Sequence, residues 1–120
     1  MILILSSCAI SGDTGTNSLL KESQNSRQDK KAILFLKEAG ATVSDSYQVV
    51  IRDVNYKLDK AEVGDVFTVD PNHSRAQLDT GSINLVWLGN DTLQIDFDKK
   101  LRTLIKKENF AGVTIIYQAR

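Results

Sequence analysis

Hydrophobic and polar residues alternate along most of the chain after residue 31. Alternate positions of a β-strand share one face of a sheet, so this period of two predicts half-buried strands. Four alternating segments lie at 47–52, 83–87, 93–98 and 113–117, and two further short strands are predicted at the continuous apolar run 32–36 and at 66–69. No amphipathic helix pattern competes with them. The chain is therefore predicted to be all-β, a small antiparallel sandwich or strongly curled sheet of about six strands.

Turn residues separate the predicted strands. Asp70-Pro71-Asn72 ends the segment 66–69, because proline fixes φ and has no N–H to donate to a neighbouring strand. Gly89-Asn90-Asp91-Thr92 joins 83–87 to 93–98 and gives the clearest predicted hairpin. Residues 53–64 are charged and carry little pattern, so they are predicted to form a loop. Residues 101–105 fit either a helical turn or an irregular strand.

The N-terminal residues have a different character. Leu5-Ser6-Ser7-Cys8 places an apolar run and two small residues before the only cysteine of the chain. This order resembles the lipobox of bacterial lipoproteins, whose cysteine is acylated and whose signal peptide is cut before it. Residues 1–8 would then be the end of a signal peptide that begins upstream, since no Lys or Arg precedes Cys8. The alternative is a short apolar strand with a buried, inert cysteine.

Residues 9–30 are predicted to be a flexible polar linker. From Ser11 to Lys31 the segment is rich in Ser, Thr, Asn, Gln, Asp and Gly, and Leu19 and Leu20 are its only large apolar side chains. Such a segment buries too little apolar surface to offset the entropy lost on ordering. The folded domain is therefore expected to span 31–119, behind a disordered N-terminal tether.

Charge limits the classes of partner. The chain has 15 basic and 15 acidic residues, so its net charge of zero argues against non-specific nucleic-acid binding. One basic cluster stands out, at Lys99, Lys100, Arg102, Lys106 and Lys107. It fits a solvated strand face or turn, or alternatively a patch for lipid headgroups or an acidic partner. No apolar run approaches the 18 or so residues that a spanning helix needs, so any membrane attachment would come through a lipid.

The order of several short motifs resembles a family of small uncharacterised bacterial proteins, many of them lipoproteins or otherwise exported. The matching pieces are Gly40-Ala41-Thr42, Gln48-Val49-Val50-Ile51, Gly64-Asp65-Val66-Phe67, Asp70-Pro71-Asn72-His73, Trp87-Leu88 with Leu93-Gln94-Ile95, and Gly112-Val113-Thr114-Ile115-Ile116-Tyr117. The resemblance covers roughly residues 26–118. Ala39 stands where the family commonly has a cysteine, and Val43 where it has a second threonine. The resemblance implies an exported, compact β-rich domain and no particular chemistry.

Asp79-Thr80-Gly81 resembles the catalytic loop of aspartic proteases, because apolar residues flank it on both sides. Those enzymes need two aspartates that share a proton. The second Asp-Thr-Gly, at Asp13-Thr14-Gly15, lies in the polar linker without the apolar strand before it. A turn before a strand uses the same residue types for conformational reasons, and this is the favoured interpretation.

His73 is the only histidine, and with Asp65 and Asp70 it forms a weak candidate for a polar surface site. A zinc site needs three or four ligands, so no metal site, cofactor or catalytic residue is predicted. The sequence therefore predicts a non-enzymatic, lipid-anchored protein of the bacterial cell envelope, held in the membrane by lipid (palmitate) on Cys8 and meeting an envelope protein partner. Ala9 after the cysteine resembles an outer-membrane destination, although either membrane would leave the domain facing the periplasm. The alternatives are a small aspartic-type hydrolase that uses Asp79, and a cytosolic accessory module whose Met1 is the true start.

Overall fold

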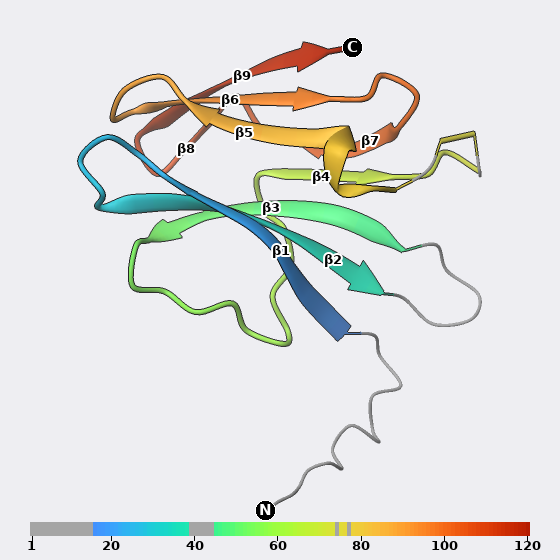
Figure 1. Cartoon of the computed structure of the whole chain (residues 1–120), viewed down its shortest axis with the longest axis horizontal. Coiled ribbons are helices and arrows are strands. Elements are labelled where there is room, and N and C mark those ends of the chain that lie inside the picture. Colours follow the sequence, from blue (N-terminus) through green and yellow to red (C-terminus); the bar gives the residue numbers. More distant parts are fainter. Residues whose placement is uncertain (1–15, 39–44, 74, 77) are drawn as a thin grey trace, which may run out of the picture.

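The computed structural model describes residues 16–38, 45–73, 75–76 and 78–120. Within these ranges the chain forms nine strands and a short 3-10 helix, in the order β1 (Thr16–Gln24), β2 (Lys30–Glu38), β3 (Ser46–Asp53), β4 (Phe67–Asp70), η3 (Thr80–Ser82), β5 (Ile83–Trp87), β6 (Thr92–Phe97), β7 (Arg102–Lys106), β8 (Asn109–Phe110) and β9 (Val113–Ala119). One sheet has the order β1-β2-β3-β4-β7 and the other β5-β6-β9-β8. The two sheets lie one above the other (Figure 1), which confirms the predicted all-β sandwich.

Strand β1 corrects the predicted linker. The second half of the segment 9–30 is not a flexible tether, because β1 pairs with β2 from Thr16↔Glu38 to Gln24↔Lys31. Leu20 packs on the core, whereas Leu19 is 53% exposed. A strand at the edge of a sheet needs few apolar side chains when backbone hydrogen bonds to its neighbour hold it. Residues 1–15, which include Cys8, and the Gly40-Ala41-Thr42 step lie outside the described residues.

The second sheet is mixed rather than purely antiparallel. The predicted β5–β6 hairpin is present and antiparallel, with Ile83 opposite Phe97 and Trp87 opposite Leu93. Strand β9, however, pairs with β6 in parallel, from Thr92↔Thr114 to Phe97↔Ala119. The chain leaves β6, forms β7 in the other sheet, and returns through β8 before it enters β9. This long crossover brings β9 back at the same end as β6, as a parallel pair requires.

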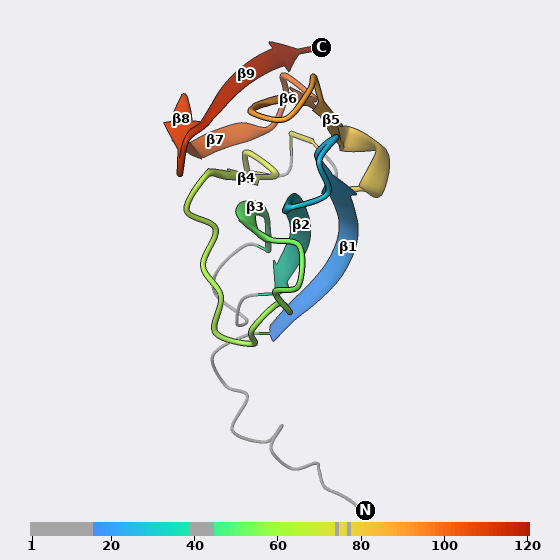
Figure 2. The ribbon, with the colours of Figure 1, turned by 90° about the vertical axis from the view of Figure 1, so that its left-hand side faces the viewer.

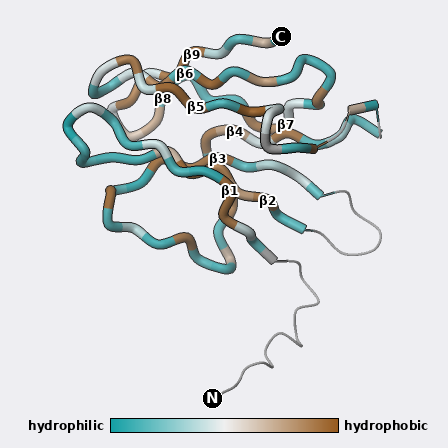
Figure 3. Tube along the Cα trace, viewed as in Figure 1, coloured by the Kyte–Doolittle hydropathy of each residue, from teal (hydrophilic) through white to brown (hydrophobic). Residues whose placement is uncertain are grey.

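The core lies between the two sheets. The alternate positions predicted to face inward in 83–87, 93–98 and 113–117 all lie in it or pack against it. Phe67 of β4 is at its centre, with ring centroids 5.2 Å from Phe97 and 5.3 Å from Tyr117. Figure 3 shows the corresponding hydrophobic stretches along the strands, with hydrophilic residues at the turns.

A second, smaller apolar cluster lies on the opposite face of the five-stranded sheet. Ile33, Phe35 and Val50 are fully buried there, beneath Tyr56 and Leu58. The loop between β3 and β4, predicted to be a loop from its charge, runs below this face in Figure 1 and covers it. Strand β2 is therefore buried on both faces, which accounts for its continuous apolar run.

Candidate functional site

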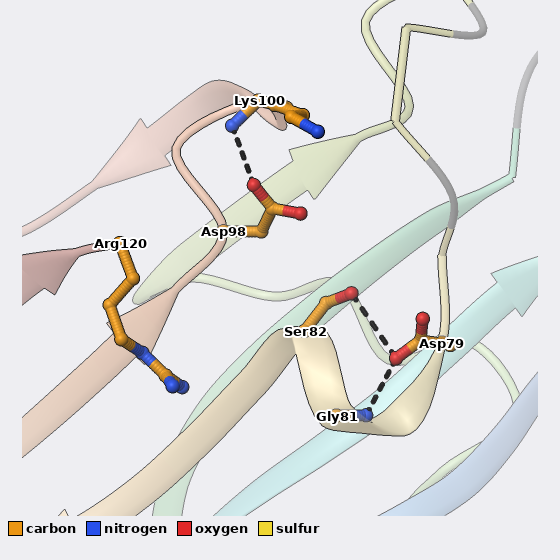
Figure 4. A pocket seen from close by; sticks show the side chains of 6 residues that line it. All are labelled: Asp79, Gly81, Ser82, Asp98, Lys100 and Arg120. Carbon is orange, nitrogen blue, oxygen red and sulfur yellow. Dashed lines mark hydrogen bonds between the residues drawn. The ribbon is translucent and has the colours of Figure 1, made fainter.

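The Asp79-Thr80-Gly81 loop borders an open depression of about 430 Å³. It is lined by Asp79, Gly81, Ser82, Asp98, Lys100 and Arg120, and Figure 4 shows these side chains. Three elements supply them: η3 before β5, the turn after β6, and the end of β9. They are brought together because Asp98 N donates to Ser82 O at 3.0 Å and Lys99 N donates to Arg120 O at 2.9 Å.

The carboxylate of Asp79 accepts hydrogen bonds from the turn that it begins. Its Oδ1 accepts from Gly81 N at 2.8 Å and from Ser82 Oγ at 3.4 Å. A carboxylate bonded two and three residues ahead of itself is a typical cap at the start of a helical turn. The motif therefore has the local geometry of a turn before a strand, the interpretation favoured from the sequence. Asp13-Thr14-Gly15 lies outside the described residues.

The rest of the depression follows the same pattern. Asp98 Oδ1 accepts from Lys100 N at 2.9 Å, again across a single turn. Every hydrogen bond drawn in Figure 4 stays within one turn of the chain. Within the described ranges, no ion pair joins these carboxylates to Lys100 or Arg120. The depression is thus a shallow surface of mixed charge in which the carboxylates shape the backbone.

The three residues of the predicted polar surface site are divided between two places. Asp70 is buried and accepts two hydrogen bonds from Arg102 Nε, at 3.1 and 3.2 Å, and one from Asn72 N at 2.9 Å. The bonds from Arg102 are the main reason why the pKa of Asp70 lies below its ordinary value. His73 is exposed in the following turn, where its φ of 57° is left-handed.

Asp65 lies at the other end of β4 and takes part in a different network. It pairs with Arg52 at 3.1 Å, and Arg52 also pairs with the buried Glu62 at 2.6 Å. Tyr56 donates a hydrogen bond to Glu62 as well. These contacts hold the β3–β4 loop on its sheet. No group of three or more His, Cys, Asp or Glu residues suited to a metal ion occurs in the part of the chain that the structure describes.

The two sides of the sandwich differ in whether their strand edges are covered. Figure 2 shows β1 and β5 on one side and β7, β8 and β9 on the other. On the first side the edge is closed by bonds between sheets. Lys21 Nζ donates to Ile83 O at 2.8 Å, Trp87 Nε1 donates to Ser23 O at 2.7 Å, and Asn25 Nδ2 donates to Asn90 O at 3.0 Å.

The edge of β9 on the second side is open over its last residues. Strand β8 covers only Val113 and Thr114. Thr114 N donates to Asp91 O at 2.8 Å and Arg120 N donates to Phe97 O at 2.9 Å, so the even-numbered residues direct their backbone groups toward β6. Because these groups alternate along a strand, the odd-numbered residues point away from β6. Ile115 N accordingly donates to Glu108 O at 2.9 Å, whereas no described strand lies beside Tyr117 and Ala119.

A depression of about 530 Å³ accompanies this edge, which we call the β9 edge groove. It is lined by Lys106, Glu108, Asn109 and residues 114–117 of β9. Lys106 Nζ lies 5.0 Å from the centroid of the Tyr117 ring, within cation–π range. Burial of Tyr117, and then the nearby charge of Glu108, raises the pKa of its hydroxyl, which donates to Lys107 O.

Sequence reasoning found Lys106 as part of a basic cluster, but it did not find the groove that Lys106 lines. The basic cluster was identified at 99–107, and the strand 113–117 was predicted. The sequence did not indicate the order of the strands, in which β9 lies between β6 and β8, a strand of only two residues. The only sign in the sequence that β8 is short is Gly112, two residues after Phe110.

Lys106 and Lys107 form no ion pair within the described residues, whereas Arg102 of the same cluster pairs with Asp70.

The part of the chain that the structure describes contains no helix long and apolar enough to cross a bilayer. Comparisons with known protein families, with curated proteins and with solved structures found no match. The features that bear on function are therefore the lipobox-like sequence, the two depressions and the open strand edge.

Proposed function

We propose that this chain is a lipid-anchored protein of the bacterial cell envelope, and that its β-sandwich is a non-enzymatic domain that binds an envelope partner. The observation that supports a binding role over catalysis is the state of the candidate carboxylates. Asp79 caps its own turn, Asp70 pairs with Arg102, and Asp65 pairs with Arg52. Side chains that fix the fold in this way are poorly placed to exchange protons with a substrate.

The proposed anchor is Cys8, on the sequence grounds given above, outside the described residues. Strand β1 begins at Thr16, so the stretch between the cysteine and the domain is shorter than the predicted linker. Acyl chains attached to a protein add roughly 0.8 kcal/mol of membrane affinity for each buried methylene. Several chains on one cysteine would therefore hold the domain at the membrane surface without a spanning helix.

The test is metabolic labelling with a fatty-acid analogue in a bacterial host, using the gene with its upstream in-frame sequence. The wild-type chain is expected to carry the label and to sediment with membranes. The Cys8→Ala variant is expected to lose the label and leave the membrane fraction or remain unprocessed. Circular dichroism of both proteins is the control, because the β-sandwich should be the same in each. An unlabelled wild-type chain would overturn the proposed anchor.

A further inference from the structure

We propose that the β9 edge groove binds an extended acidic segment of another protein, which adds to the sheet as a strand beside Tyr117 and Ala119 of β9. This inference rests on the proposed binding function and specifies its site. The first support is the hydrogen-bonding pattern of β9. Tyr117 and Ala119 direct their N–H and C=O groups toward an edge with no described strand, and such a row is a template for one more strand.

The contrast between the covered and the open side of the sandwich supports a binding role for the open edge. Lys21 caps a backbone carbonyl of β5, and Trp87 closes the same side against β1. Proteins usually cover or pair an exposed edge to prevent unwanted strand pairing. Here one side is covered and the other is left open over β9, beyond the two residues of β8.

Charge selects the occupant. Lys106 lies against Tyr117 at the groove, and Lys107 Nζ lies 5.7 Å from the Phe110 ring at the adjacent β8. Glu108 is the only acidic residue among those that line the groove. Lysines beside an edge repel a strand that carries cations of its own, including a second copy of this edge, and attract one that carries carboxylates.

The bound segment would be held in two ways. Its backbone would pair with Tyr117 and Ala119, which supplies affinity without regard to sequence. Acidic side chains on one of its faces would lie next to Lys106 and Lys107, which supplies selectivity and makes binding weaken as salt is added. A β-branched residue on the other face would extend the apolar surface that Ile116, 40% exposed, offers beside the edge.

The experiment uses the full chain and the synthetic peptide acetyl-Thr-Val-Glu-Val-Glu-Val-Thr-amide as the probe. Amide hydrogen exchange is followed by NMR in the free and peptide-saturated protein. In the free chain, Ile116 and Gln118 should exchange slowly and Tyr117 and Ala119 fast. The peptide should slow exchange at Tyr117 and Ala119 by about tenfold or more and leave the other two unchanged.

Variants separate the backbone contribution from the charge contribution. Ala119→Pro removes an N–H on the open edge and keeps the hydrogen bonds to β6. It should lower the affinity for the peptide by about tenfold. Ala119→Thr keeps that N–H and should bind as the wild type does. Lys106→Glu combined with Lys107→Glu should abolish the preference for acidic peptide. Lys60→Glu, an equal kind of charge change in the exposed β3–β4 loop, should have no effect.

Several results would overturn the inference. A lysine-for-glutamate version of the peptide that binds equally well would remove the charge argument. Protection of amides elsewhere, or no binding, would remove the strand site. Protection of Tyr117 and Ala119 in the free chain, with a dimer in sedimentation, would make a second copy the occupant. Failure of fatty-acid labelling would refute the lipid anchor alone, because none of these readouts depends on Cys8.

Discussion

Phe35→Ala tests whether the β3–β4 loop covers the outer face of the five-stranded sheet. Phe35 is on that face yet is fully buried, with Ile33 and Val50, beneath Tyr56 and Leu58. Removal of a fully buried Phe side chain costs about 3–5 kcal/mol, from lost transfer free energy and from the cavity left behind. A domain of this size is stable by roughly 5–15 kcal/mol, so about a fifth or more of its stability should disappear.

Urea unfolding followed by the fluorescence of Trp87, the only tryptophan, measures this loss. Val86→Ala is the matched control, because Val86 lies on the outer face of the other sheet and is 40% exposed. It should cost about 1 kcal/mol or less. The double variant of Phe35→Ala with Leu58→Ala should show a coupling of about 0.5 kcal/mol or more. Equal losses for Phe35→Ala and Val86→Ala, or a coupling of zero, would refute the covering role of the loop.

Three further changes test local features of the fold. Gly64→Ala should destabilise the protein by about 1–3 kcal/mol in urea unfolding, because its new Cβ would lie 2.6 Å from Gln48 Cβ; an unchanged midpoint would contradict this contact. The bonds from Arg102 lower the pKa of Asp70 below 3.8, so Asp70 stabilises the fold above that pH and loses this effect as pH falls through its folded pKa. Asp70→Asn should therefore flatten the acid limb of stability against pH, and an identical acid limb would argue against the pair. Asp79→Ala should lower the melting temperature more than Asp79→Asn, since the amide oxygen can still cap the turn; equal losses would exclude the cap.

Period-two alternation was enough to place the strands whose one face meets the core. Segments 83–87, 93–98 and 113–117 were predicted in this way, and their inward side chains pack in the core. The same reasoning missed β1, because an edge strand held by backbone bonds to β2 can be almost wholly polar. It also predicted 47–52 to be buried on one face only, whereas Val50 on the other face is buried as well, because no local pattern indicates that a loop will fold back over it.

The candidate site was less predictable than the fold. Among the described candidates, Asp65 and Asp70 pair with arginines on other elements, and Asp79 caps its own turn. Such pairing depends on which strands become neighbours. The open edge depends on it even more, because β6 and β9 become neighbours only after the chain has visited the other sheet. Alternation identifies which face of a strand is buried and says nothing of which strand lies beside it.

The position of β9 has a consequence for how the chain is made. Of the described strands, β9 comes last in chain order, yet it lies between β6 and β8 in its sheet, and Arg120 beyond it bonds to Phe97 and Lys99. Until that strand leaves the ribosome or a membrane channel, the β5–β6 hairpin has no second neighbour and the core lacks Ile115 and Tyr117. Pairings this distant in sequence form slowly. The four-stranded sheet is therefore completed only after β9 has been synthesised or transferred, and truncation within 113–119 would leave β6 without its second neighbour.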